Sequence, residues 1–313
     1  MMDPDAIARV RRFNRAVTAE VGALDTSFLG RGRPLGAARV LNSIGRGITD
    51  VARLRDSLGL DSGLTSRLLR GLEEEGLVQT VAHRDDARRR VVHLTRAGQR
   101  EFGAYEKLSD DQAGAMLARH SHPETMLAAM DLIACALQRD RTVVEEADPK
   151  GGPARACLQA YYDELARRFA SGFDVARSRD PDAAEMIPPL GTFLLAWADG
   201  LPVGCVGLKG DGGDLAEVKR LWVAPAARGQ GLARRLMAAV EDAAHQLRIR
   251  VLRLDTNSAL PEAIQLYRKT GWIKIPRFND DPYPDVFFEK RLRTRKESAG
   301  ATQSRPIRSA KLR

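Results

Sequence analysis

The stretch "VAPAARGQGLARRLM", residues 223–237, decides how the second half of this chain folds. It follows "AEVKRLWV", which predicts a strand, and its own second part has apolar residues at helical spacing. Gly229 and Gly231 stand between the two, where the absence of a Cβ lets the backbone turn and approach a ligand closely. The free N–H groups at the start of the helix favour an anion such as phosphate.

Isolated Gly-x-Gly is also typical of a plain strand-to-helix turn, so the surrounding pattern matters. The stretch lacks the Gly-Lys-Ser/Thr ending of a P-loop and the spacing of a dinucleotide fingerprint. Strands are predicted at 141–149, at 191–209 as a pair around Asp199-Gly200, at 216–223, at 250–257 and near 285–292. Helices are predicted at 154–169, from 232 to about 247, and at 261–271. Alternation of this kind predicts an α+β domain built on a central sheet.

The glycine turn, the strand before it and "TNSALPEAIQLYRKTGW", residues 256–272, agree in order and spacing with one family. In these motifs the chain resembles the GNAT N-acetyltransferase superfamily over residues 141–293. The resemblance implies a mixed central sheet, acetyl-CoA as the acyl donor, and direct transfer to an amine without a covalent acetyl-enzyme or a metal. The acceptor amine is not specified by any motif.

The resemblance also implies roles for individual residues. Tyr267 matches the tyrosine that protonates the leaving thiolate, and a half-buried helix aromatic is the alternative. Glu217 occupies a position where some members place a general base, and a surface glutamate at a strand start is the alternative. The N–H of Val223 could polarise the thioester carbonyl. The residues implied to bind the coenzyme are Leu221, Trp222, Val223, Arg228, Gly229, Gln230, Gly231, Leu232, Ala233, Arg234 and Asn257.

An acidic segment, "NDDPYPDVFFEKRL", lies where the last strands of this family shape the acceptor site. Asp280, Asp281 and Asp285 could favour a cationic amine there. A solvated acidic turn is the alternative interpretation.

The first half has a different pattern. Short helical segments at 49–59 and 61–76, which open with Thr49 and Asp61 as candidate N-caps, are followed by two alternating runs, 77–83 and 89–95, around the polar tip "RDDAR". Helix, turn, helix and hairpin predict a mainly-α winged helix-turn-helix, whose second helix enters the major groove of DNA. Leu64, Leu68 and Leu72 recur at helical spacing and are expected to face the core. The expected DNA-binding residues are Ser62, Thr65, Ser66, Arg67, Arg70, Arg84, Arg88, Arg89 and Arg90.

These motifs, with long helices at both ends, resemble the MarR family of transcriptional regulators over residues 12–139. The resemblance implies a homodimer formed by the first and last helices, which reads two half-sites of a DNA duplex. A solvated basic face is the alternative for each arginine cluster taken alone.

Composition agrees with a two-domain globular protein. The 313 residues are 43% hydrophobic, which excludes global disorder, and a net charge of +9 suits a polyanionic partner. No apolar run predicts a membrane span, and the beginning of the chain lacks the apolar core of a secretory signal. Cys135, Cys157 and Cys205 lack the spacing of metal ligands. We therefore expect a cytoplasmic protein with reduced thiols. The expected domains are 1–140 and 141–293, followed by a basic disordered tail at 294–313.

The two resemblances together predict a transcriptional regulator that is also an acetyl-CoA-dependent N-acetyltransferase. One alternative is a repressor whose second domain senses acetyl-CoA or an amine without turnover. Another is an acetyltransferase whose first domain serves only as a scaffold.

Overall fold

A computed structural model describes residues 3–83, 86–177 and 185–292. The chain divides into two compact units, an N-terminal unit, Met1–Pro123, and a C-terminal unit, Glu124–Arg313. The helix at 123–138, which the sequence places in the first domain, therefore groups with the C-terminal unit, where its Cys135 is buried in the core. The predicted disordered tail at 294–313 lies outside the described residues. No helix in the described part of the chain has the length and apolar character needed to span a membrane.

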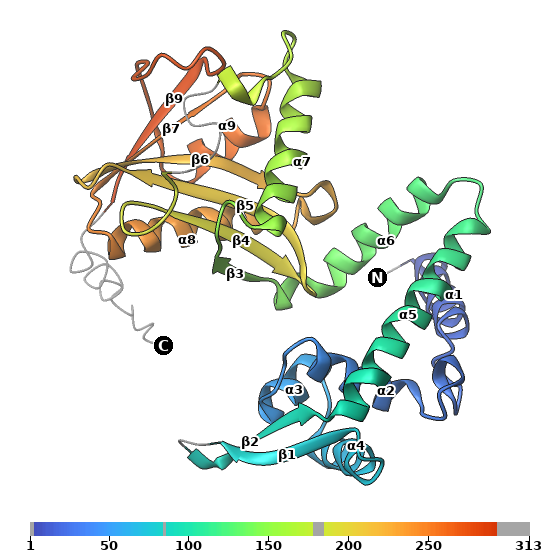
Figure 1. Cartoon of the computed structure of the whole chain (residues 1–313). Coiled ribbons are helices and arrows are strands. Elements are labelled where there is room, and N and C mark those ends of the chain that lie inside the picture. The colour runs from blue at the N-terminus through green and yellow to red at the C-terminus, as the bar shows by residue number, and fades with distance from the viewer. Residues whose placement is uncertain (1–2, 84–85, 178–184, 293–313) are drawn as a thin grey trace, which may run out of the picture. The chain divides into compact units, whose positions relative to one another are not determined.

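The N-terminal unit is the expected winged helix-turn-helix (Figure 1). Several helices and a two-stranded hairpin pack around one apolar core, which includes Val40, Leu41 and Leu54. Its elements are α1 (Pro4–Glu20), the short 3-10 turn η1 (Phe28–Gly30), α2 (Leu35–Gly45), α3 (Val51–Leu58), α4 (Ser62–Glu74), β1 (Val78–His83), β2 (Asp86–Leu94) and α5 (Arg96–Ala118).

Side-chain caps fix the ends of the two motif helices. The Asp61 carboxylate accepts a hydrogen bond from the Leu64 N–H at 2.8 Å, so α4 begins where the sequence predicts. Helix α3 begins one residue later than predicted, because Asp50 and not Thr49 is its N-cap. The carbonyl of Thr49 instead accepts from the Val92 N–H of the wing at 2.8 Å, which ties this residue to the hairpin.

Helix α4 is rotated from the expected orientation. Its buried stripe is Thr65, Leu69 and Leu72, while Leu64 and Leu68 are only half-buried. Thr65 is 2% exposed, and its hydroxyl donates to the Asp61 carbonyl at 2.7 Å. Because the Thr65 hydroxyl forms its hydrogen bond within its own helix, the side chain can be buried in the core. The expectation that Thr65 lies on the DNA-facing side of α4 is therefore wrong. The remaining predicted α4 residues are exposed: Ser62, Ser66, Arg67 and Arg70.

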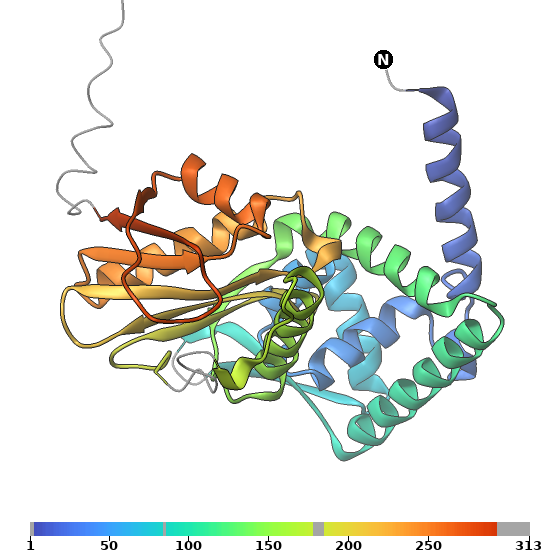
Figure 2. The ribbon, with the colours of Figure 1, turned by 90° about the horizontal axis from the view of Figure 1, so that it is seen from above.

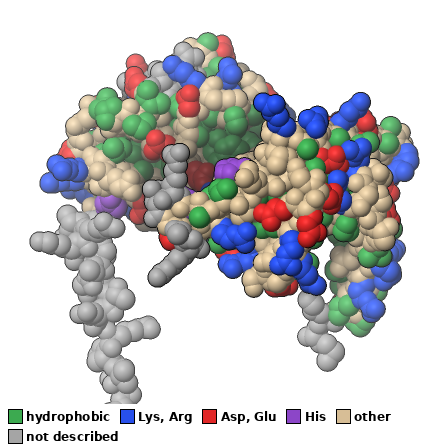
Figure 3. Space-filling view, turned by 60° about the horizontal axis from the view of Figure 1, so that its bottom comes forward, with side chains coloured by type: hydrophobic (Ala, Val, Ile, Leu, Met, Phe, Trp, Pro, Cys, Tyr) green, Lys and Arg blue, Asp and Glu red, His purple; other side chains and the backbone are tan. Residues whose placement is uncertain are grey.

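The hairpin forms the wing. β1 and β2 pair antiparallel from Val78 opposite Leu94 to His83 opposite Asp86. Arg90 is exposed, whereas the guanidinium of Arg89 forms an ion pair with Asp50 at 2.7 Å. Arg84 and the side chain of Arg88 lie outside the described residues. Lysine and arginine side chains are frequent over the N-terminal unit in the space-filling view (Figure 3).

The C-terminal unit is built on a mixed sheet, as expected for this half, with seven strands in the order β3-β4-β5-β6-β7-β9-β8. Among the described strands, only the β6–β7 pair is parallel. Its elements are α6 (Pro123–Gln138), β3 (Val143–Glu146), α7 (Gly152–Arg168), β4 (Thr192–Ala198), β5 (Leu201–Gly210), β6 (Leu215–Val223), α8 (Leu232–Gln246), β7 (Val251–Thr256), α9 (Pro261–Lys269), β8 (Ile273–Ile275) and β9 (Val286–Arg291), with 3-10 turns at η2 (Arg139–Arg141), η3 (Val175–Arg177) and η4 (Pro225–Ala227).

Helices cover both faces of this sheet (Figure 2). Alternate residues of β4 face opposite layers, because successive side chains of a strand point to opposite sides. Leu194 and Ala196 pack on the side of α8 and α9, and Phe193 and Leu195 pack on the side of α7. The three cysteines are free and buried, and Cys157 lies beside Cys205 on the α7 side.

A close approach in the N-terminal unit gives the first prediction. Gly98 lies in the first turn of α5, where a Cβ would stand 1.9 Å from the carbonyl oxygen of Leu77. We therefore expect Gly98→Ala to lower the free energy of unfolding of the N-terminal unit by about 1–3 kcal/mol. Urea unfolding of the full chain followed by far-UV circular dichroism measures this.

The matched control is Gly103→Ala in the same helix, where a Cβ meets nothing within 4 Å. Alanine is the better helix former, so this variant should gain about 0.5–1 kcal/mol. Equal unfolding midpoints for the two variants would contradict the close packing of α5 on the hairpin.

Candidate active site

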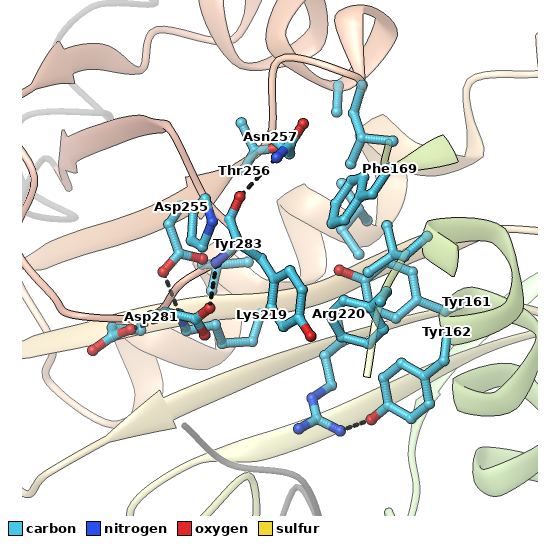
Figure 4. A pocket seen from close by; sticks show the side chains of 18 of the residues that line it. Tyr161, Tyr162, Phe169, Lys219, Arg220, Asp255, Thr256, Asn257, Asp281 and Tyr283 are labelled. Carbon is cyan, nitrogen blue, oxygen red and sulfur yellow. Dashed lines mark hydrogen bonds and ion pairs between the residues drawn. The ribbon is translucent and has the colours of Figure 1, made fainter. Parts of the chain in front are cut away.

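A pocket opens where β6 and β7 diverge. The two strands pair only from Leu215 to Glu217 against Val251 to Arg253, although β6 runs on to Val223 and β7 to Thr256. A bulge on β6 increases the divergence, since Arg220 and Leu221 together stand opposite Val206 alone, and Arg220 has a φ of 59°. The resulting pocket holds about 980 Å³ of space, part of it open to solvent (Figure 4).

The glycine turn leads from β6 into α8 on the same strand end. Gly229 and Gly231 have φ values of 75° and 83°, and a Cβ at either would meet nothing within 4 Å. Gly231 is the N-cap residue of α8. Because glycine has no side chain, no side-chain hydrogen bond caps this end of the helix. Among the described residues, no acceptor bonds the N–H of Gly229, Gln230 or Gly231. Successive free amides with open space in front of them fit a diphosphate.

Glu164 of α7 holds the residues around this turn. Its carboxylate accepts hydrogen bonds from Trp222 Nε1 at 3.0 Å and from the guanidinium of Arg228. Arg228 Nε also donates to the carbonyl oxygen of Val223 at 2.9 Å. Burial alone would raise the pKa of Glu164, but the bonds from Arg228 and Trp222 outweigh burial and lower it. The side chain of Arg228 is thus engaged by other groups of the protein. Of the other residues predicted to bind the coenzyme, Gly231 and Arg234 are exposed and Leu232 is buried.

Tyr267 lies in the pocket, as its predicted role requires. Its side chain is 6% exposed and packs against Trp272 and Phe288, with ring centroids 6.1 and 5.7 Å apart. Burial, reinforced by the nearby charge of Asp255, raises the pKa of Tyr267 well above its ordinary value of 10. The phenol therefore keeps its proton throughout the neutral range.

Two further tyrosines, Tyr161 and Tyr162, come from α7 and line the same pocket (Figure 4). Burial also raises the pKa of Tyr161, and Tyr267 contributes to that shift. The hydroxyl of Tyr162 accepts a hydrogen bond from Arg220, whose guanidinium carbon stands 5.4 Å from the centre of the Tyr162 ring. No motif singled out these tyrosines, because "AYYDELARRF" has only the pattern of an amphipathic helix.

Glu217 lines the pocket but is not alone there. Its carboxylate pairs with Lys219 Nζ at 2.9 Å, and the same ammonium pairs with Asp255 at 2.6 Å. Burial would lower the pKa of Lys219, but the charges of Asp255 and Glu217 outweigh it and raise the pKa above 10.5. The lysine therefore stays charged between the two carboxylates. No sequence motif indicates this triad, since its members come from two strands.

Asn257 follows β7, as expected, but both polar atoms of its side-chain amide form hydrogen bonds with the protein. Nδ2 donates to the Tyr283 carbonyl at 2.7 Å, and Oδ1 accepts from the Ala259 N–H at 2.8 Å. In this arrangement Asn257 holds the loop after β8 over the pocket. Its contact with a coenzyme stays a prediction.

Comparison with known proteins identifies both halves. Residues 31–89 match the MarR family, and residues 158–272 match the acetyltransferase (GNAT) family. An IAA acetyltransferase from Azospirillum brasilense is 33% identical over 146 residues, which are 45% of this chain and 94% of that protein. The chain belongs to the GNAT acetyltransferase family.

Two other comparisons concern the same GNAT domain. An uncharacterized N-acetyltransferase of Schizosaccharomyces pombe is 32% identical over 103 residues, 32% of this chain and 63% of that protein. A crystal structure of a GNAT-family acetyltransferase from Staphylococcus aureus is 18% identical, with a TM-score of 0.43 over 49% of this chain and 99% of that chain. The chain is thus a MarR domain fused to a GNAT acetyltransferase domain.

The triad gives the second prediction. Lys219→Met would leave Glu217 and Asp255 facing each other without their shared cation, so we expect the free energy of unfolding of the GNAT domain to fall by about 3–5 kcal/mol at pH 7. The raised pKa of Lys219 keeps its contribution fully present below about pH 10.5, and it is lost only as the pH rises through the raised value. Tryptophan fluorescence during urea unfolding reports this domain, because all three tryptophans lie in it.

Lys209→Met is the control. Lys209 pairs with Glu185, whose side chain is 60% exposed, so this variant should lose no more than about 1 kcal/mol. If Lys219→Met is as stable as Lys209→Met, the triad does not stabilise the opening between the strands.

Proposed function

We propose that this chain is a DNA-binding regulator that also transfers the acetyl group of acetyl-CoA to an amine. The observation that carries the proposal is the pocket at the divergence of β6 and β7, with the buried phenol of Tyr267 inside it, in a domain of the GNAT family. Acetyl-CoA, when bound, supplies an acetyl thioester. The residues that would hold it are the amides of Gly229, Gln230 and Gly231 and the first turn of α8, with β6 residues 221–223 along its arm.

Tyr267 is proposed as the proton donor to the leaving sulfur. Its raised pKa means that the proton is present at neutral pH, and also that the phenol gives it up only as negative charge develops on the sulfur. Glu217 is proposed as the group that takes a proton from the incoming amine. Its ion pair with Lys219 orients the carboxylate at the pocket wall.

Replacing the phenol tests this. We expect Tyr267→Phe to lower kcat at least about a hundredfold while leaving the Kd for acetyl-CoA unchanged, because only the proton is removed. Thiol release over a panel of amines measures turnover, and isothermal titration with acetyl-CoA measures binding.

Tyr161→Phe is the matched comparison, since Tyr161 is the other pocket tyrosine whose pKa burial raises. A larger loss of kcat from Tyr161→Phe than from Tyr267→Phe would assign the proton to Tyr161. Tight acetyl-CoA binding without thiol release on any amine would favour the alternative, a regulator that senses the coenzyme. No binding of acetyl-CoA would contradict both.

The N-terminal unit is proposed to bind a DNA duplex as a homodimer. The exposed side chains of Arg67 and Arg70 on α4, together with Arg90 on the wing, supply positive charge on the elements that enter and flank a groove. Helix α1 buries none of its residues and exposes Ile7, Val10 and Val17 at spacings of three and seven. An apolar stripe of this kind suits a second copy of the helix.

Arginine removal tests the DNA proposal. We expect Arg67→Ala with Arg70→Ala to weaken duplex binding and to reduce the slope of log K against log salt by about one for each phosphate group that an arginine no longer neutralises. Titration of an operator duplex at several salt concentrations gives both quantities, and the stoichiometry should be two chains to one duplex.

Arg155→Ala with Arg167→Ala on α7 removes the same charge from exposed positions of the other unit and should leave the slope unchanged. Equal effects of the two double variants would mean that net charge alone attracts DNA. In that case the N-terminal unit would be a scaffold.

A further inference from the structure

The pocket has a carboxylate that forms no ion pair with the described residues. Asp281 lines the pocket and is 9% exposed. Its carboxylate accepts one hydrogen bond, from the Tyr283 N–H at 3.1 Å. A carboxylate buried to this extent, with no ion-pair partner among the described residues, is suited to bind a cationic group of a ligand.

The loop after β8 holds Asp281 in place. Arg277 donates to the carbonyl oxygens of Asp281 at 2.9 Å and Pro284 at 2.6 Å, and its guanidinium stands 4.8 Å from the centre of the Phe287 ring. Asn257 fixes the same loop from β7 through the Tyr283 carbonyl. Asp281 is therefore a positioned pocket residue, and the alternative of a solvated acidic turn does not hold for this residue. Asp280 is exposed and does not line the pocket, and Asp285 instead binds Ser258.

The cations of the pocket lining are already engaged. Lys219 pairs with Glu217 and Asp255, Lys209 pairs with Glu185, and Arg220 donates to the Tyr162 hydroxyl. Within the described lining, Asp281 therefore offers its negative charge to a ligand, whereas the cationic side chains already have partners in the protein. An acceptor with a carboxylate would bring a second negative charge close to Asp281.

Aromatic side chains form the wall next to Asp281 (Figure 4). The ring of Tyr283 lies 4.7 Å from that of Phe173 and 6.1 Å from that of Phe169. The Tyr283 hydroxyl accepts a bond from the Asp174 N–H at 2.9 Å, which joins the loop after α7 to the loop after β8. A fixed aromatic wall favours a flat ring on the ligand and also favours a nearby cation.

We propose that the acceptor is a primary amine that carries an aromatic ring on a short alkyl arm and no carboxylate, and that Asp281 binds its ammonium group. This inference rests on the proposed acetyl transfer. In the reaction the ammonium loses a proton, the nitrogen forms a bond to the thioester carbon, and the carbon–sulfur bond breaks. The nitrogen loses a second proton. One of the two passes through Glu217 to water, and the sulfur takes the proton of Tyr267, which the other replaces.

The test uses the full chain at saturating acetyl-CoA with three probes. These are 2-phenylethylamine, phenylalanine, which adds a carboxylate, and butylamine, which lacks the ring. We expect kcat/KM for 2-phenylethylamine to exceed that for each of the others at least about tenfold. A preference for phenylalanine or butylamine would overturn the inference, while thiol release on any of them would leave the proposed function standing.

Asp281→Asn isolates the charge, because the amide oxygen can still accept from the Tyr283 N–H. We expect the KM for 2-phenylethylamine to rise about tenfold to a hundredfold, with the Kd for acetyl-CoA unchanged. Asp280→Asn, at the exposed neighbouring position, should change neither. An unchanged KM in Asp281→Asn would overturn the assignment of the ammonium to this carboxylate.

Direct binding separates the two proposals. Calorimetric titration of 2-phenylethylamine needs no turnover, and its affinity should fall by the same factor in Asp281→Asn. If no amine releases thiol, the proposed function fails, yet a charge-dependent affinity would still establish the amine site. Equal affinity of the two variants, or no binding to the natural chain, would overturn the inference.

Discussion

The GNAT domain depends on one break in its backbone hydrogen bonding. β6 and β7 pair for three residues and then separate, and a bulge at Arg220 and Leu221 lies in the part of β6 that β7 no longer pairs with. A strand that leaves its partner exposes polar backbone groups and opens the sheet, which is unfavourable unless other groups bridge the gap. The pocket exists because such groups are present on both strands.

An ion-pair triad joins β6 and β7 where the two strands begin to separate. Lys219 comes from β6 and pairs across the gap with Asp255 of β7, while Glu217 takes the remaining side of the ammonium. Because these groups are largely removed from water, their attraction is weakly screened. The same low exposure keeps Tyr267 protonated, so one environment both holds the strands and sets the state of the candidate proton donor.

Helix α7 completes the site from a distant part of the sequence. Glu164 binds Trp222 and Arg228, so a helix that precedes most of the sheet fixes the strand end that precedes the glycine turn. The loop after α7 meets the loop after β8 through Tyr283 and Asp174. Both sets of hydrogen bonds join segments that are far apart in the chain, and they give the pocket its aromatic and acidic walls.

Local chemistry could be predicted from the sequence with good accuracy. Asp61 as a helix cap, Asp199-Gly200 as a hairpin turn, and Gly229 and Gly231 at positive φ are all decided within a few residues by backbone sterics and short hydrogen bonds. The helices and strands around them follow from periodicity, and the two family patterns follow from the order of these elements. The three-residue β8 was missed, because so short a strand has no periodicity.

Tertiary structure decided what the local pattern leaves open. Two apolar stripes are possible on α4, and packing against the core buried Thr65 with Leu69 in place of Leu64 with Leu68. Glu217 has the pattern of a lone strand glutamate, but β7 brings Asp255 to the same lysine. Asp281 has the pattern of a polar turn, but Arg277 and Asn257 hold its loop over the pocket. The sequence by itself determined the elements, their order and the two families, because those depend on neighbours in the chain; the charge state and the walls of the site were decided only in the fold, because they depend on neighbours in space.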